Sequence, residues 1–156
     1  MPHNRGVSAS VKRRTLEALL ADAETRIARF APAEAHAATS TDALLIDIRS
    51  DSDRERDGIV PGSLHIPRTV LEWRTAPDSS SRNPHVGALD RQVILLCDHG
   101  CSSILAAAVL TELGFTRAGD IIGGFAAWRD ANLPVNRARS RIRSLDEPAG
   151  MSLPDP

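Results

Sequence analysis

The chain has 156 residues, 42% of them hydrophobic and 25% charged, and a mass of 16.8 kDa. This length is enough for one globular domain with its own apolar core, so the fold needs neither disulfides nor a metal. The 19 Lys and Arg residues and 20 Asp and Glu residues give a formal net charge of -1, which argues against general binding to nucleic acid. The two cysteines exclude a disulfide scaffold.

The apolar runs are too short for a membrane span. None approaches the ~18 apolar residues needed to cross a bilayer, and the N-terminal region lacks the apolar stretch and cleavage site of a signal peptide. We therefore expect a cytoplasmic protein without a membrane partner. In the cytoplasm the two cysteines would stay reduced, so they are candidates for thiol chemistry or small buried residues.

An amphipathic helix is predicted in the N-terminal extension, residues 1–31. Apolar side chains recur there at three- and four-residue steps until Pro32, which ends the pattern. They are Leu16, Leu19, Leu20, Ala23, Ile27 and Phe30. Because Asp22 and Glu24 occupy the polar face, the apolar stripe is expected to pack on the main domain or on a second copy of the chain, which would give a homodimer. Residues 1–9 are polar and aperiodic and are predicted to be disordered.

The central part of the chain predicts an α/β fold. Pro32 and Glu34 favour a short helix that ends near Ala38. Two near-continuous apolar runs, 43–48 and 93–97, are typical of strands that are covered on both faces. Such strands imply a mainly parallel, doubly wound sheet with helices on both sides.

A second helix and strand follow in the same pattern. The composition of 103–113 predicts a helix that Gly114 ends, and a third strand is predicted near 120–122. A turn at Gly123-Gly124 then leads into a last helix with Trp128 packed in the core.

We therefore expect an α/β domain over residues 32–136 and an Arg-rich tail over 137–156. The tail has few apolar residues to bury, so we expect it to be flexible. Its arginines could contact an anionic partner, but a solvated tail is the favoured interpretation.

The segment around Cys97 carries the clearest chemical signal. It leaves a buried strand and enters a helix within about six residues, which places Cys97 where open α/β sheets bind ligands. The amides of such a loop and the positive helix end favour a thiolate and can hold an anion, and Gly100 allows the backbone to curl. The amides expected to bind substrate are those of Asp98, His99, Gly100, Cys101, Ser102 and Ser103.

Several motifs in fixed order surround this loop and together resemble the rhodanese (thiosulfate:cyanide sulfurtransferase) family over residues 32–135. They are Asp47-Ile48-Arg49, the run Glu55 to Gly58, the run Ile59 to Pro67, Gly114-Phe115, Gly123-Gly124-Phe125, Trp128 and Leu133-Pro134-Val135. The resemblance implies the doubly wound α/β fold and a catalytic Cys97 that carries a persulfide. Its thiolate would take sulfur from thiosulfate, a small sulfur-containing anion, or another donor and pass it to a thiol or to cyanide. We expect no cofactor.

Two other functions remain as alternatives. One is a binding or regulatory module of the same fold without turnover. The other is arsenate reductase or phosphatase chemistry, which related proteins perform with a longer loop and an arginine six positions after the cysteine. Ser103 stands at that position and the loop contains no arginine, so bidentate phosphate recognition is missing. This absence also departs from the thiosulfate-using members that keep a cation in the loop.

Three arginines outside the loop are candidate substrate cations: Arg49, Arg68 and Arg74. Arg49 is more readily explained as a brace for the strand end, paired with Glu55. Arg68 and Arg74 are expected on the surface of a helix whose Trp73 packs in the core.

The other polar side chains of the loop affect the state of the Cys97 sulfur. Cys101 could attack a Cys97 persulfide and form a disulfide, as a redox partner, or could be a passive side chain. His99 would favour the thiolate if protonated, or would face solvent. Asp98 is expected to point outward, because a carboxylate near the sulfur would oppose the thiolate. We expect no bound metal, because zinc ligation by Cys97, His99 and Cys101 would crowd three ligands into one short loop.

Overall fold

The computed structural model describes residues 12–138, and its strands form one sheet. The strands are β1 (Ala28–Phe30), β2 (Leu44–Asp47), β3 (Leu64–His65), β4 (Val93–Leu96) and β5 (Ala118–Ile121). They pair in the order β1-β5-β4-β2-β3, and every pair is parallel. The predicted parallel sheet is therefore confirmed.

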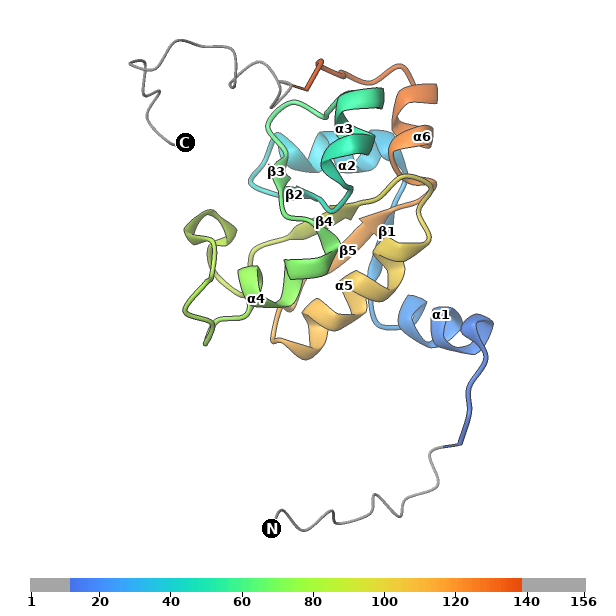
Figure 1. Cartoon of the computed structure of the whole chain (residues 1–156), viewed down its shortest axis with the longest axis vertical. Coiled ribbons are helices and arrows are strands. Elements are labelled where there is room, and N and C mark those ends of the chain that lie inside the picture. Colours follow the sequence, from blue (N-terminus) through green and yellow to red (C-terminus); the bar gives the residue numbers. More distant parts are fainter. Residues whose placement is uncertain (1–11, 139–156) are drawn as a thin grey trace.

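Helices cover both faces of this sheet (Figure 1). They are α1 (Leu16–Glu24), α2 (Pro32–Thr39), α3 (Asp51–Asp57), α4 (Leu71–Thr75), α5 (Ser102–Glu112) and α6 (Gly124–Asp130). In Figure 1, α5, α4 and α1 lie on one side, whereas α2, α3 and α6 lie on the other. The predicted helices before and after the central strands are confirmed within a few residues of their bounds.

The apolar core lies in two layers because successive side chains of a strand point to opposite faces. Leu95 of β4 packs with Leu110 of α5 in one cluster. Its neighbour Ile94 packs in the other cluster with Phe125 and Trp128 of α6. All residues of β2, β4 and β5 are buried, which explains why two of these strands are continuous apolar runs in the sequence.

The predicted N-terminal helix is shorter than expected. Thr15 caps its start and the helix ends at Glu24, whereas the prediction extended it to Phe30. Instead, Ala28–Phe30 forms the edge strand β1, which pairs with β5. The prediction was wrong here because apolar residues three apart fit a helix, and a three-residue strand is recognised only through its partner.

The apolar stripe of α1 packs on α5. Ala23 is fully buried there, whereas Leu16 is 65% exposed and Leu19 is 39% exposed. A homodimer through this helix stays a prediction.

Two other predictions lie outside the described residues. These are the disorder of residues 1–9 and, from residue 139 onward, the Arg-rich tail. Within residues 12–138, no helix is long and apolar enough to cross a membrane.

Gly124→Ala should destabilise the fold more than Gly62→Ala. Both glycines have a positive φ, of 61° and 78°, which costs an alanine roughly 1–2 kcal/mol. At Gly62 a new Cβ would meet nothing within 4 Å, whereas at Gly124 it would lie 2.4 Å from the carbonyl oxygen of Cys97. Urea unfolding should therefore show a loss about 1–3 kcal/mol larger for Gly124→Ala. Equal losses would contradict this reading of the close approach between α6 and Cys97.

Candidate active site

The loop between β4 and α5 is held by the first turn of α6. Cys97 directly follows β4, and α5 begins at Ser102. The backbone N–H of Phe125 donates to the carbonyl of Cys97 at 2.7 Å, and the N–H of Ala126 donates to the carbonyl of Asp98 at 3.0 Å. Because C=O and N–H of a trans peptide point in opposite directions, these bonds turn the following amides away from α6.

The sulfur of Cys97 is nearly buried among polar groups. The residue is 5% exposed, the N–H of Gly100 donates to Sγ at 3.1 Å, and the Ser103 hydroxyl oxygen lies 3.2 Å from Sγ. Burial by itself raises the pKa of the Cys97 thiol, but hydrogen bonds from Ser103, Ser102 and Gly100 outweigh it and hold the pKa below its ordinary value. The site therefore favours a thiolate.

A cavity of about 350 Å³ opens beside this sulfur. It is lined by the loop residues Cys97, Asp98, His99, Cys101 and Ser102 and, on the other side, by Ile48, Arg49, Ser50 and Asp53. The fold thus brings together the predicted nucleophile, most of its loop and one of the three candidate cations. A small molecule in this cavity could reach the sulfur.

Arg49 braces the wall of the cavity through Asp47. The guanidinium donates to both carboxylate oxygens of Asp47, at 3.1 and 2.8 Å, and to the carbonyl of Gly58 at 2.8 Å. Its flat face covers the ring of Phe125, 3.9 Å from the ring centre. The sequence predicted Glu55 as the partner of Arg49. The guanidinium instead pairs with Asp47, the last residue of β2, which lies two positions earlier in the chain.

Two charged residues that no sequence motif marks, Arg29 and Asp120, lie next to Ser103 and the Cys97 loop. The Ser103 hydroxyl donates to Oδ2 of Asp120 at 2.7 Å, and Nε of Arg29 donates to Oδ1 of Asp120 at 2.9 Å. The hydrogen bond to Asp120 raises the pKa of the Arg29 guanidinium. The sequence offers one signal for this pair: Asp120 is an acidic residue inside a strand that is expected to be buried. A buried charge requires a partner of opposite charge.

Comparison with known proteins agrees with this geometry. A family model described as a rhodanese-like domain matches residues 31–131. This chain belongs to the rhodanese-like family.

Two curated relatives of this rhodanese-like domain are named thiosulfate sulfurtransferase GlpE. The protein from Stutzerimonas stutzeri is 35% identical over 105 residues, which cover 67% of this chain and 87% of the relative. The protein from Vibrio cholerae is 46% identical over 91 residues, which cover 58% and 76%. The family resemblance inferred from the motifs is therefore confirmed.

A solved structure from Rhodopseudomonas palustris is also similar to this rhodanese-like domain. It has a TM-score of 0.74 and 33% sequence identity, and the match covers 84% of this chain and 100% of that one. It is described as a protein of unknown function and possible tyrosine phosphatase. The fold of this chain therefore also occurs in a solved structure.

Two candidate cations do not line the cavity of the rhodanese-like domain. Arg68 forms an ion pair with Glu72 at 2.5 Å, and Arg74 donates to the carbonyl of Ser81 at 2.6 Å. Trp73, between them, is 61% exposed rather than packed in the core. That prediction was wrong because α4 is short and buries only the side that carries Leu71 and Thr75.

Asp98 does not point away from the cavity as expected. It lines the cavity, and its carboxylate lies 3.9 Å from Nη1 of Arg49, a buried nitrogen without a hydrogen bond. Burial and the nearby carboxylate of Asp53 raise the pKa of Asp98, and Arg49 opposes this rise. Attraction to the buried guanidinium explains the inward position.

The second cysteine lies at the mouth of the cavity. Cys101 is exposed and free, and it immediately precedes α5. His99 also lines the cavity. Among residues 12–138, the His, Cys, Asp and Glu side chains form no group of three that could hold a metal ion.

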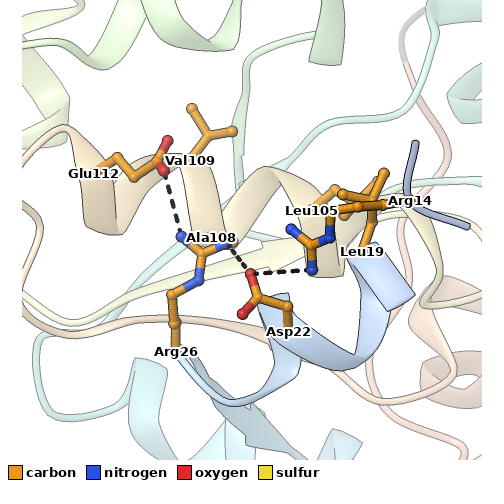
Figure 2. A pocket seen from close by; sticks show the side chains of 8 residues that line it. All are labelled: Arg14, Leu19, Asp22, Arg26, Leu105, Ala108, Val109 and Glu112. Atoms are coloured by element: carbon orange, nitrogen blue, oxygen red, sulfur yellow. Dashed lines mark hydrogen bonds and ion pairs between the residues drawn. The ribbon is translucent and has the colours of Figure 1, made fainter. Parts of the chain in front are cut away.

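A separate hollow of about 440 Å³ lies between α1 and α5 (Figure 2). Its charged groups neutralise one another. Arg26 pairs with Asp22 at 3.3 Å and with Glu112 at 3.4 Å, and Arg14 lies 3.9 Å from the same Asp22. The lining residues include no nucleophile, so the smaller cavity at Cys97 is the better candidate for chemistry.

Ser103→Ala should raise the pKa of the Cys97 thiol, because it removes a hydrogen bond that favours the thiolate. The rate of alkylation by iodoacetamide against pH gives this pKa, in a Cys101→Ser background that removes the exposed thiol. We expect the parent midpoint below the ordinary value of 9.0 and the Ser103→Ala midpoint higher by about one unit.

The matched control is Ser79→Ala, which removes an exposed hydroxyl bound to the Trp73 carbonyl. This variant should leave the midpoint unchanged. If Ser103→Ala behaves like the control, the hydroxyl does not stabilise the thiolate.

Proposed function

We propose that this chain is a sulfurtransferase that carries a persulfide on Cys97. The observation that supports this most directly is the nearly buried Cys97 sulfur, bonded by the Gly100 amide at 3.1 Å and open to a cavity of about 350 Å³. The relatives from the same family named thiosulfate sulfurtransferase support it independently.

In the first step, the Cys97 thiolate attacks the outer sulfur of a donor such as thiosulfate. A bond forms between Sγ and that sulfur, while the sulfur–sulfur bond of the donor breaks and sulfite leaves with the electron pair. Cys97 then holds a persulfide. The groups that stabilise the resting thiolate keep Cys97 deprotonated before the attack and also stabilise the negative charge of the persulfide. The loop therefore needs no separate general base for this step.

In the second step, an acceptor thiolate or cyanide attacks the outer sulfur of the persulfide. The bond between that sulfur and Sγ breaks, and Cys97 leaves again as a thiolate. A low thiol pKa assists this step too, because a more stable thiolate is a better leaving group.

The charges of the cavity disfavour a dianionic donor. Asp98 and Asp53 both line it, whereas the guanidinium of Arg49 is already bound to Asp47. Thiosulfate would therefore bind weakly, and a donor with less negative charge would bind better.

Asp98→Asn should increase kcat/KM for thiosulfate by about fivefold or more at low salt, because it removes one negative charge from the cavity. Steady-state rates with cyanide as acceptor measure this effect. Asp90→Asn, at an exposed carboxylate outside this cavity, should leave kcat/KM unchanged. A decrease with Asp98→Asn would mean that this carboxylate assists the reaction.

The phosphatase alternative has less support. The R. palustris protein is described as a possible tyrosine phosphatase, but the loop of this chain contains no arginine and places Ser103 at the position that would need one. A phosphate ester would lack bidentate recognition there. We therefore expect no turnover of an aryl phosphate.

Intact-protein mass spectrometry tests the persulfide directly. After treatment with a sulfane donor, the parent and Cys101→Ser should each gain the mass of one sulfur atom, whereas Cys97→Ser should gain none. Gain of sulfur by Cys97→Ser would contradict the proposed site. No gain by the parent with any donor would favour a binding module without turnover.

A further inference from the structure

The charge pair beneath the nucleophile joins three parts of the fold. Arg29 of β1 contacts Asp120 of β5 through Nε at 2.9 Å and through Nη2 at 3.3 Å. The same Nη2 donates to the carbonyl of Gly100 in the active-site loop at 3.3 Å. Asp120 in turn accepts a hydrogen bond from the Ser103 hydroxyl, whose oxygen lies 3.2 Å from the Cys97 sulfur. One guanidinium thus connects the edge strand, the neighbouring strand and the loop.

These contacts depend on the pairing of β1 with β5. Arg29 and Asp120 are direct partners in the register of this pair, so their side chains leave the sheet on the same side. Asp120 is fully buried, and the Arg29 side chain is 25% exposed. Arg29 also lies outside the residues matched by the family model, 31–131.

The single proton of the Ser103 hydroxyl has two acceptors within reach. In the thiol form, Cys97 donates to the hydroxyl oxygen and the hydroxyl donates to Asp120. When the sulfur is a thiolate, the hydroxyl can turn and donate to it instead. Asp120 remains satisfied in that state, because Arg29 donates to both of its carboxylate oxygens.

Arg29 also compensates a negative charge near the nucleophile. The distances through the Ser103 hydroxyl place the Asp120 carboxylate within about 6 Å of the Cys97 sulfur, a range in which an uncompensated carboxylate opposes a thiolate. The loop itself, residues 97–103, contains no lysine or arginine. Arg49, which lines the cavity, is bound to Asp47.

We propose that Arg29 is a positioning residue for Cys97. Its guanidinium supplies, from outside the loop, the cation that the loop lacks. It also fixes the Asp120 carboxylate and the Gly100 carbonyl, so that the Ser103 hydroxyl can donate a hydrogen bond to the thiolate. The pair of Arg29 and Asp120 therefore sets the reactivity of the nucleophile.

Other titratable and charged groups face the sulfur from several elements. The loop contributes Asp98, His99 and Cys101, the end of β2 contributes Arg49, and α3 contributes Asp53. The variants must differ in none of these groups, so all share one background, and Arg29→Gln and Asp120→Asn each alter only one member of the pair.

The pH dependence of Cys97 alkylation tests the proposal in a Cys101→Ser background. Arg29→Gln leaves Asp120 uncompensated and should raise the thiol pKa by about one unit, with about tenfold less thiolate at pH values below it. Asp120→Asn leaves Arg29 uncompensated and should lower the pKa. These opposite shifts distinguish an electrostatic role from a loss of packing, which would impair both variants alike.

Two further variants serve as controls. Arg29→Lys keeps the charge and should bring the pKa back to within about half a unit of the parent value. Arg26→Gln removes an arginine that pairs only with exposed carboxylates on α1 and α5 in the described part of the chain, and should not change the pKa. Thermal unfolding of each variant shows that it is folded.

Shifts of Arg29→Gln and Asp120→Asn in the same direction, or no shift in either, would overturn the proposal. If Arg29→Gln does not fold, Asp120→Asn decides alone, and a pKa that rises or stays constant overturns it. The inference builds on the proposed role of Cys97, but alkylation reports the thiol itself. A chain without sulfur transfer could therefore still show the opposite shifts.

Discussion

The convergence of hydrogen-bond donors on one sulfur depends on the close contact between α6 and the loop that follows β4. The amides of Phe125 and Ala126 bind two loop carbonyls, and this contact requires Gly124, where a Cβ would collide with the loop backbone. With its carbonyls held on one side, the loop can direct the Gly100 amide to the Cys97 sulfur. Backbone amides thus act together with the Ser103 hydroxyl to lower the pKa of the nucleophile.

Two ion pairs complete this environment on β2 and β5, the strands on either side of β4. Asp47 and Arg49 stiffen the wall of the cavity, whereas Asp120 lies beneath the sulfur with Arg29. A buried carboxylate without a partner destabilises the fold. Each arginine is therefore held in place by the aspartate that it pairs with on the sheet. The pair of Asp47 and Arg49 shapes the cavity, and the pair of Asp120 and Arg29 is proposed to act on the thiol.

The proposed sulfur transfer makes two demands on the same atom, because Cys97 would attack a donor and later leave as a thiolate. A stabilised thiolate serves both steps, which fits a site built from amides and hydroxyls rather than from a general base. The charges that line the cavity act on a different property. Asp98 and Asp53 line the cavity with negative charge, so in the proposed function reactivity and donor preference arise from separate groups.

The amino-acid sequence was enough to predict the parallel sheet, the position of Cys97 at the end of a central strand and the family, because long apolar runs and glycine-rich turns are local patterns with local physical causes. The folded structure was needed to find the edge strand β1, the inward position of Asp98 and the partnership of Arg29 with Asp120. These two partners are 91 residues apart in the chain. No local pattern encodes such a contact, because it arises from strand register and from the requirement that a buried charge be paired.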